Sequence, residues 1–127
     1  MAEPLRALVV DDEPDVQLLF SQRFRRETKK GLVQLSYAES GPEALKVLKS
    51  AATDVALVLS DINMPGMTGL ELLRIIKAEY PDLRVMMVTA YDDAAMQEEA
   101  FSNGAEGYLI KPIDFSKLKR DVFELEV

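Results

Sequence analysis

Short apolar runs alternate with helix-like segments along the whole chain, and this alternation constrains the fold more than any other feature of the sequence. Three runs are predominantly apolar, Leu5–Val10, Val55–Ser60 and Val85–Ala90, which is typical of strands covered on both faces. Residues 32–38 instead alternate apolar and polar side chains, so this strand is expected at an edge of the sheet. Gly107–Ile110 is the fifth predicted strand.

Helical periodicity follows each predicted strand. Five helices are expected, over residues 14–28, 40–51, 68–79 and 91–104 and after Pro112, where apolar residues recur at Phe115, Leu118, Val122 and Leu125. Five strands, each followed by a helix, indicate an α/β fold with a doubly wound, five-stranded parallel sheet. Because the apolar strands should be central and the alternating second strand should lie at an edge, the strand order 2-1-3-4-5 is favoured. The length suits one domain over residues 1–127.

Two residue types are absent from the sequence, and their absence narrows the chemistry. The chain has no cysteine, which excludes disulfides, thiolate nucleophiles and cysteine–zinc sites. It has no histidine either, which excludes serine–histidine–aspartate catalysis and a histidine general base. If a phosphohistidine takes part in the function, another protein carries it.

Charge and hydropathy exclude further classes of protein. The net charge of −7 argues against direct binding of nucleic acid by this chain. No stretch approaches the ~18 apolar residues that span a bilayer, so no membrane segment is expected. The N-terminal residues lack a basic region followed by a small-residue cleavage site, and a cytoplasmic location is therefore expected.

Polar side chains stand at the carboxyl ends of four predicted strands. Asp11 and Asp12 follow the first strand, Asp61 the third, Thr89 closes the fourth, and Lys111 follows the fifth. In a doubly wound sheet, ligands bind beyond these ends at the point where the strand order reverses. Neighbouring strands lie ~4.8 Å apart, so these side chains are expected to converge.

Three carboxylates at one place are electrostatically costly. Two carboxylates ~5 Å apart repel by roughly 3 kcal/mol at an effective dielectric of 20. Either one of them is protonated or a cation binds, and an open loop with oxygen ligands suits Mg²⁺. A divalent ion with a lysine and a threonine hydroxyl attracts phosphoryl oxygens. In a chain without histidine or cysteine, Asp61 is the best-placed covalent acceptor.

Four sequence segments resemble the receiver domain of two-component response regulators, a flavodoxin-like fold. They are VVDDE (Val9–Glu13), SDINMPGMTGLEL (Ser60–Leu72), VTA (Val88–Ala90) and YLIKP (Tyr108–Pro112). Each segment alone is weak evidence, but their order and their fit to successive strand ends are specific. The resemblance covers essentially the whole chain and implies a phosphoacceptor domain of a two-component phosphorelay.

The resemblance also implies roles for individual residues. Asp61 would accept a phosphoryl group from a sensor histidine kinase or a histidine phosphotransfer protein. Asp11, Asp12 and Asp61, with the backbone carbonyl of Asn63, would hold Mg²⁺. Lys111 would pair with a phosphoryl oxygen. Such a domain phosphorylates itself and slowly hydrolyses its own acyl phosphate, but it is not a turnover enzyme.

A conformational switch is implied in the same way. Thr89 would bond the phosphoryl group and draw its loop inward, and Tyr108 would turn from exposed to buried. This would remodel the face formed by the fourth predicted helix, the fifth strand and the last helix, through which an output domain or a homodimer would be controlled. The Lys111–Pro112 peptide bond would be cis. Thr68 stands where the family often has aspartate, and both residues cap helices.

Two further interpretations concern residues around the predicted site. Tyr91, two residues beyond Thr89, is expected to shield the phosphoryl group from water, and Asn63 to influence the same dephosphorylation rate. A run of basic residues is interpreted as the solvated end of the first helix, with kinase docking as a secondary reading: Arg23, Arg25, Arg26, Lys29 and Lys30.

Rival functions fit the sequence less well. A phosphatase with an aspartate nucleophile needs a second acid two residues on, where this chain has Asn63. A flavin-binding protein needs a phosphate cradle, whereas the loop after the first strand is acidic. An interaction module that has lost phosphorylation has no specific support. A free-standing regulator and a receiver within a longer protein remain equally compatible with the sequence.

Overall fold

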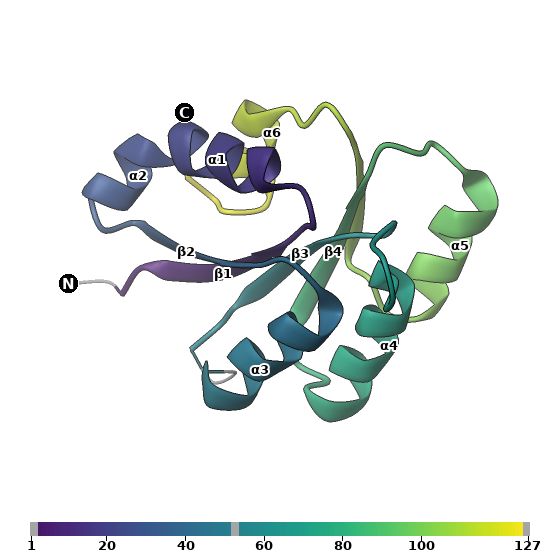
Figure 1. Cartoon of the computed structure of the whole chain (residues 1–127). Helices are drawn as coiled ribbons and strands as arrows, with labels where there is room; N and C mark the ends of the chain where they lie inside the picture. Colours follow the sequence, from purple (N-terminus) through teal and green to yellow (C-terminus); the bar gives the residue numbers. More distant parts are fainter. Residues whose placement is uncertain (1–2, 52–53, 126–127) are drawn as a thin grey trace.

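The computed structural model describes residues 3–51 and 54–125 and contains a five-stranded, fully parallel sheet (Figure 1). The strands are β1 (Leu5–Val10), β2 (Val33–Ala38), β3 (Leu57–Asp61), β4 (Arg84–Thr89) and β5 (Gly107–Ile110). Their order across the sheet is β2-β1-β3-β4-β5, which confirms the predicted order. Every residue of β3 is buried, as expected for a central strand of a parallel sheet.

Helices cover both faces of the sheet. They are α1 (Pro14–Arg23), α2 (Arg25–Lys29), α3 (Gly41–Ala51), α4 (Gly69–Glu79), α5 (Ala94–Ser102) and α6 (Phe115–Asp121). Figure 1 shows α1, α2 and α6 on one face, and α3, α4 and α5 on the other. The described residues contain no helix of the length and apolar character that crossing a membrane requires.

Two predicted helices differ most from those in the structure, and α5 begins at Ala94 rather than at the predicted residue 91. The first predicted helix is divided at Phe24, so the described residues form six helices rather than five. Phe24 is fully buried, and its ring packs against Phe20 and Phe115. The last helix ends at Asp121, so the prediction that it continues to Leu125 is wrong. The chain turns there because Phe123 packs into the core against Phe24.

The core has two parts, one on each side of the sheet. Beneath α1 and α6, the inward side chains of the strands meet a cluster of aromatic rings: Phe20, Phe24, Phe115 and Phe123. Beneath α3, α4 and α5, the core is aliphatic and includes Leu48, Leu72, Leu73 and Ile76. Both layers hold the strands firmly, so the carboxyl ends of β1, β3, β4 and β5 have fixed relative positions.

Candidate functional site

The sheet register brings the predicted site residues to one edge. Val10, the last residue of β1, is level with Ser60 of β3, and Asp61 is level with Val88 of β4. Thr89 at the end of β4 pairs with Ile110, the residue before Lys111. The residues that follow these strands therefore leave the sheet side by side, as the parallel topology predicts.

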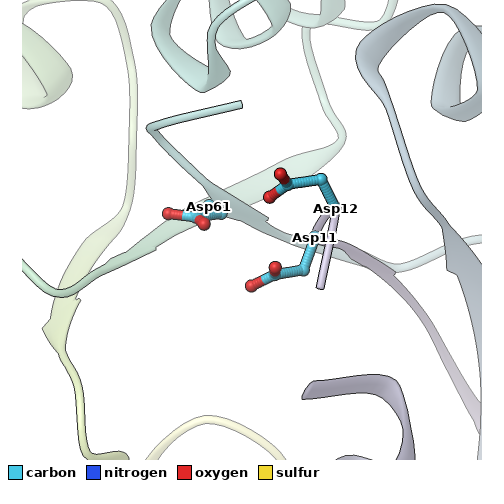
Figure 2. Close-up of side chains that lie close together, drawn as sticks. All are labelled: Asp11, Asp12 and Asp61. Atoms are coloured by element: carbon cyan, nitrogen blue, oxygen red, sulfur yellow. The ribbon is translucent and has the colours of Figure 1, made fainter. Parts of the chain in front are cut away.

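Three carboxylates meet at this edge (Figure 2). One carboxylate oxygen from each of Asp11, Asp12 and Asp61 lies within 4.8 Å of the other two. Asp11 is 2% exposed and Asp61 is 7% exposed, whereas Asp12 is half-buried. The cluster therefore has a buried floor and one side that is accessible to solvent.

Lys111 is the cation of this cluster. Its ammonium group donates a hydrogen bond to Oδ2 of Asp11 at 2.9 Å and lies 3.6 Å from Oδ2 of Asp61. Asp12 forms no ion pair with the described residues. One ammonium group thus faces three carboxylates, which leaves excess negative charge in a largely buried place.

The surroundings of the cluster shift the pKa values of two of these groups. Burial raises the pKa of the Asp61 carboxyl, and the Asp11 carboxylate adds to this effect while Lys111 offsets part of it. For Lys111, burial alone would lower the pKa, but the carboxylates of Asp11 and Asp61 raise it above its ordinary value. Lys111 therefore stays charged at neutral pH, whereas ionisation of Asp61 is less favourable than that of an ordinary aspartate.

Backbone contacts fix the loop that carries Asp61. The Ser60 hydroxyl donates to the Asp61 carbonyl at 2.9 Å, and the Gly69 N–H donates to the Ile62 carbonyl at 2.7 Å. A β-carbon on Gly69 would lie 2.0 Å from the Asp61 carbonyl oxygen, so only glycine permits this approach. The sequence does not indicate that position 69 requires glycine, because this requirement depends on a contact with another segment.

The first turn of α4 holds the other end of this loop. The Thr68 hydroxyl accepts a hydrogen bond from the Glu71 N–H at 3.2 Å, and the Glu71 carboxylate accepts one from the Thr68 N–H at 3.0 Å. This reciprocal pair is a capping box, which agrees with the capping role expected of Thr68. The cap and Gly69 together fix where α4 starts relative to Asp61.

The predicted switch residues are joined through the backbone of Tyr91. Thr89 is fully buried, and its hydroxyl accepts a hydrogen bond from the Tyr91 N–H at 3.2 Å. Tyr108 is half-buried, and its hydroxyl donates to the Tyr91 carbonyl at 3.0 Å. The Tyr91 side chain is 57% exposed. The sequence predicts a role for the Tyr91 side chain. In the structure, the contacts with Thr89 and Tyr108 are made instead by the N–H and carbonyl groups of Tyr91.

The remaining predicted residues lie around the same edge. Asn63 is exposed two residues after Asp61, in the loop before α4. The Lys111–Pro112 peptide bond is cis. A backbone hydrogen bond from the Lys111 N–H to the Thr89 carbonyl, 2.8 Å long, ties the ends of β4 and β5 together. All of the predicted site residues except Tyr108, which lies within β5, therefore belong to loops or strand ends around the acidic cluster.

The donor set fits a magnesium ion. Mg²⁺ prefers oxygen ligands, takes one or two carboxylates and keeps several waters. The three clustered carboxylates supply such oxygens, and the solvent-accessible side at Asp12 leaves room for water. A divalent cation would also offset the excess negative charge that Lys111 leaves. The chemistry of Asp11, Asp12 and Asp61 is thus suited to a hard divalent ion.

Comparison with known proteins identifies the family. The profile of the response regulator receiver domain matches residues 7–123, and the chain belongs to this family. It is 39% identical over 109 residues to the DNA-binding transcriptional regulator NtrC of Proteus hauseri, covering 86% of this chain and 22% of the relative. It is 35% identical over 114 residues to the heme response regulator HssR of Staphylococcus aureus, covering 90% of this chain and 48% of the relative.

Solved structures show the same fold. The response regulator TrrA of Thermotoga maritima, in complex with Mg²⁺ and beryllofluoride, is 34% identical with a TM-score of 0.79. That match covers 96% of this chain and 99% of TrrA. CheY in the CheX–CheY complex of Borrelia burgdorferi is 28% identical with a TM-score of 0.84, over 96% of this chain and 89% of that one.

Membership of the family defines the general role of the chain. Receiver domains are regulatory phosphoacceptors rather than turnover enzymes, and they generally bind Mg²⁺ through acidic residues. They interact with histidine kinases and with output domains in response regulators. The chain spans about a fifth of the NtrC relatives and about half of HssR.

Proposed function

We propose that residues 1–127 form one receiver domain in which Asp61 is the phosphorylation site. The observation that carries this proposal is the position of Asp61 at the end of central strand β3, within 4.8 Å of the Asp11 and Asp12 carboxylates and 3.6 Å from the Lys111 ammonium group. A phosphohistidine of a sensor histidine kinase or histidine phosphotransfer protein is the donor. The domain acts in the cytoplasm.

The reaction exchanges one bond to phosphorus for another. A P–O bond to a carboxylate oxygen of Asp61 forms while the P–N bond of the donor breaks, and the proton of the phosphorylated imidazole stays with the departing histidine. Asp11, Asp12, Asp61 and the carbonyl of Asn63 would hold Mg²⁺. When bound, this ion neutralises charge on the phosphoryl oxygens.

Two side chains of the protein complete the site. Lys111 already contacts Asp11 and lies near Asp61, so its ammonium group is positioned to bind a phosphoryl oxygen. The Thr89 hydroxyl donates to another phosphoryl oxygen after it leaves the Tyr91 N–H. Asn63 and the exposed side chain of Tyr91 flank the phosphoryl group and control the access of hydrolytic water.

Phosphorylation changes the face formed by α5, β5 and α6. The movement of Thr89 releases the Tyr91 N–H, and the Tyr91 carbonyl is the acceptor for the Tyr108 hydroxyl. Tyr108 belongs to β5, so its movement inward transmits the change to this face. One charge-assisted hydrogen bond can shift such an equilibrium when the two states differ by a few kcal/mol. The face then controls an output domain or forms a homodimer.

Acetyl phosphate provides a direct test of the acceptor. We expect a mass increase of one phosphoryl group in the presence of Mg²⁺, and no increase with EDTA or in Asp61→Asn. Asp114→Asn is a matched control, because this exposed aspartate caps α6 outside the cluster, and it should be phosphorylated like the wild type. Phosphorylation of Asp61→Asn, or its persistence without Mg²⁺, contradicts the proposal.

A further inference from the structure

An open groove lies where α1, α2 and α6 meet. Its volume is about 620 Å³. Figure 1 shows these three helices together on one face of the sheet. The segment that lines the groove ends just before β2, and Val33 at the start of β2 is level with Leu5 at the start of β1. The groove therefore lies toward the amino ends of the strands, away from the acidic cluster. It is lined by Gln22, Arg23, Arg25, Arg26, Glu27, Lys29, Lys30 and Lys119.

The lining is strongly basic although the chain as a whole is acidic. Six of the eight lining residues are cations and one is a carboxylate, whereas the whole chain carries a net charge of −7. Five of these cations are exposed and form no ion pair with the residues that the structure describes: Arg23, Arg25, Arg26, Lys29 and Lys30. Their charges are thus available to an external anion.

Glu27, the only carboxylate among the lining residues, already forms an ion pair with another lining residue, Lys119. Glu27 is 5% exposed, and its Oε1 lies 3.2 Å from the ammonium group of Lys119. The same ammonium donates to the Arg23 carbonyl at 2.5 Å and lies 5.2 Å from the centre of the Phe24 ring. These contacts connect α6 to the α1–α2 junction. They use the Glu27 carboxylate within the floor of the groove and leave the five exposed cations uncompensated.

Part of the rim is also held in place. The Arg23 guanidinium lies 5.5 Å from the centre of the Phe115 ring, which packs in the aromatic cluster. Arg25 and Lys29 border a second hollow of about 240 Å³ that contains the hydrogen-bonded hydroxyls of Ser21 and Tyr37. This hollow lies beside the groove and shares Arg25 and Lys29 with it. A donor that is already held in place, such as the Arg23 guanidinium, loses less entropy when a ligand binds.

We propose that this groove binds an acidic segment of a partner polypeptide, rich in aspartate and glutamate. Arginine presents its N–H groups as a planar fork that matches a carboxylate, and three of the five free cations are arginines. The groove is open where the three helices meet, so a peptide segment can reach its cations from solvent. Charge complementarity between the free cations and such a segment is the basis of binding.

Other anions fit this groove less well. A nucleotide or a single-stranded nucleic acid needs an aromatic surface for its bases, and the lining contains no aromatic side chain. A duplex or an anionic membrane is an extended negative surface, which the net charge of −7 repels. A short acidic segment contacts the groove alone and avoids this repulsion. The proposal concerns a surface separate from the phosphorylation site and depends on none of its chemistry.

Binding of a fluorescein-labelled octaglutamate peptide, followed by fluorescence anisotropy at low salt, tests the proposal. We expect saturable binding that weakens as salt is raised to about 0.2 M, because exposed charges are screened over ~8–10 Å at such ionic strengths. Octaglutamine of the same length is not expected to bind. The double variant Lys29→Gln with Lys30→Gln should weaken octaglutamate binding by about five- to tenfold.

A second double variant separates the groove from general electrostatics. Lys46→Gln with Lys49→Gln removes the same two charges from the exposed side of α3, outside the groove. We expect less than a twofold effect on octaglutamate binding. Equal weakening by both double variants, or no binding by the wild type, overturns the proposal.

Two further measurements distinguish other occupants of the groove. Inorganic tripolyphosphate that binds the groove more tightly than octaglutamate overturns the peptide assignment in favour of a phosphate ligand. Sedimentation that reveals a dimer, which the groove variant dissociates and the α3 variant does not, overturns it in favour of a second copy of this chain. A monomer that prefers octaglutamate supports the proposal.

Discussion

At the scale of single residues, Asp61 carries a charge that destabilises the fold, and it is also the residue we propose as the phosphoryl acceptor. Its carboxylate lies in a largely buried place beside the Asp11 carboxylate, and the Lys111 ammonium only partly offsets the repulsion. The folded state therefore holds the Asp61 proton more tightly than the unfolded state does, as its raised pKa indicates. The same excess charge provides the attraction for a divalent cation.

Asp61→Asn should stabilise the protein at pH 7 when EDTA is present. Because the pKa of Asp61 is raised by burial in the folded state, stability is lost as pH rises from the unfolded value through the folded one. We expect a gain of about 1–2 kcal/mol, since two nearby carboxylates repel by roughly 3 kcal/mol and Lys111 offsets part of this. Urea denaturation at a series of pH values measures the gain, which should shrink toward pH 4. A gain that is independent of pH contradicts this explanation.

Lys111→Met should destabilise the protein in EDTA more than in Mg²⁺. Removal of one partner from a buried ion pair costs about 3–5 kcal/mol. We expect about 1–3 kcal/mol, because the Lys111 side chain is 21% exposed. Mg²⁺ should reduce this loss by supplying positive charge to Asp11 and Asp61. Urea denaturation in both conditions measures the difference.

Lys77→Met is a matched control for this prediction. Lys77 pairs with Glu106 at 2.6 Å and is 18% exposed, but it belongs to α4, outside the acidic cluster. Its loss should destabilise the protein equally in EDTA and in Mg²⁺. If Mg²⁺ fails to reduce the cost of Lys111→Met, Lys111 and the metal do not share the same carboxylates.

The residues of the acidic cluster were predictable because each stands directly beside a strand end. Parallel strands bring their carboxyl ends to one edge, so Asp11, Asp61 and Lys111 had to converge once the strand order was inferred. Gly69 and the peptide groups of Tyr91 were not predictable. Their roles depend on distances to other segments, which no local pattern encodes.

At the scale of elements, the start of α4 fixes the position of the loop that follows Asp61. The Gly69 N–H donates to the Ile62 carbonyl, and the Gly69 α-carbon packs against the Asp61 carbonyl. The helix therefore begins against the loop with no space for a side chain. The geometry of Asp61 depends on this packing as well as on β3.

Gly69→Ala should destabilise the protein by about 2 kcal/mol or more. Alanine favours helices over glycine by about 1 kcal/mol, but its β-carbon would lie 2.0 Å from the Asp61 carbonyl oxygen. The steric effect prevails, because the contacts are with backbone atoms that cannot rotate away. Urea denaturation measures the loss, and acetyl phosphate should also phosphorylate this variant more slowly.

Thr68→Ala separates the packing of α4 from its capping. Loss of the cap should cost about 1 kcal/mol and leave phosphorylation by acetyl phosphate nearly unchanged. Equal effects of Thr68→Ala and Gly69→Ala on phosphorylation would show that the close approach at Gly69 does not position Asp61.

The sequence predicts which segments form strands and helices more completely than it predicts the residues at which they begin and end. The five strands and their order follow from hydrophobic patterns and connection rules. The division at Phe24 has no glycine or proline to mark it, and the end of α6 results from the packing of Phe123. Tertiary contacts determine both helix boundaries. The hydrophobic periodicity of the sequence continues past these boundaries and therefore does not indicate them.

At the scale of the whole molecule, Mg²⁺ should raise the thermal stability of the protein. A ligand that binds only the folded state at a hundred times its Kd contributes about 2.7 kcal/mol. For a domain of this size we expect a Tm increase of about 5–10 °C. Sodium chloride of equal ionic strength is the control, since screening of the net charge of −7 gives a smaller, unspecific gain. Equal effects of the two salts contradict a specific metal site.

The hydrogen bonds of Tyr91 have a consequence for how the domain can diversify. Thr89 and Tyr108 both bind peptide groups of this residue, so the link between them is independent of which side chain the residue carries. Under the proposed function, exchange of the exposed ring for a smaller or charged group would leave these hydrogen bonds of Thr89 and Tyr108 intact. The lifetime of the proposed phosphoryl group could then be changed at this position without changing the proposed switch.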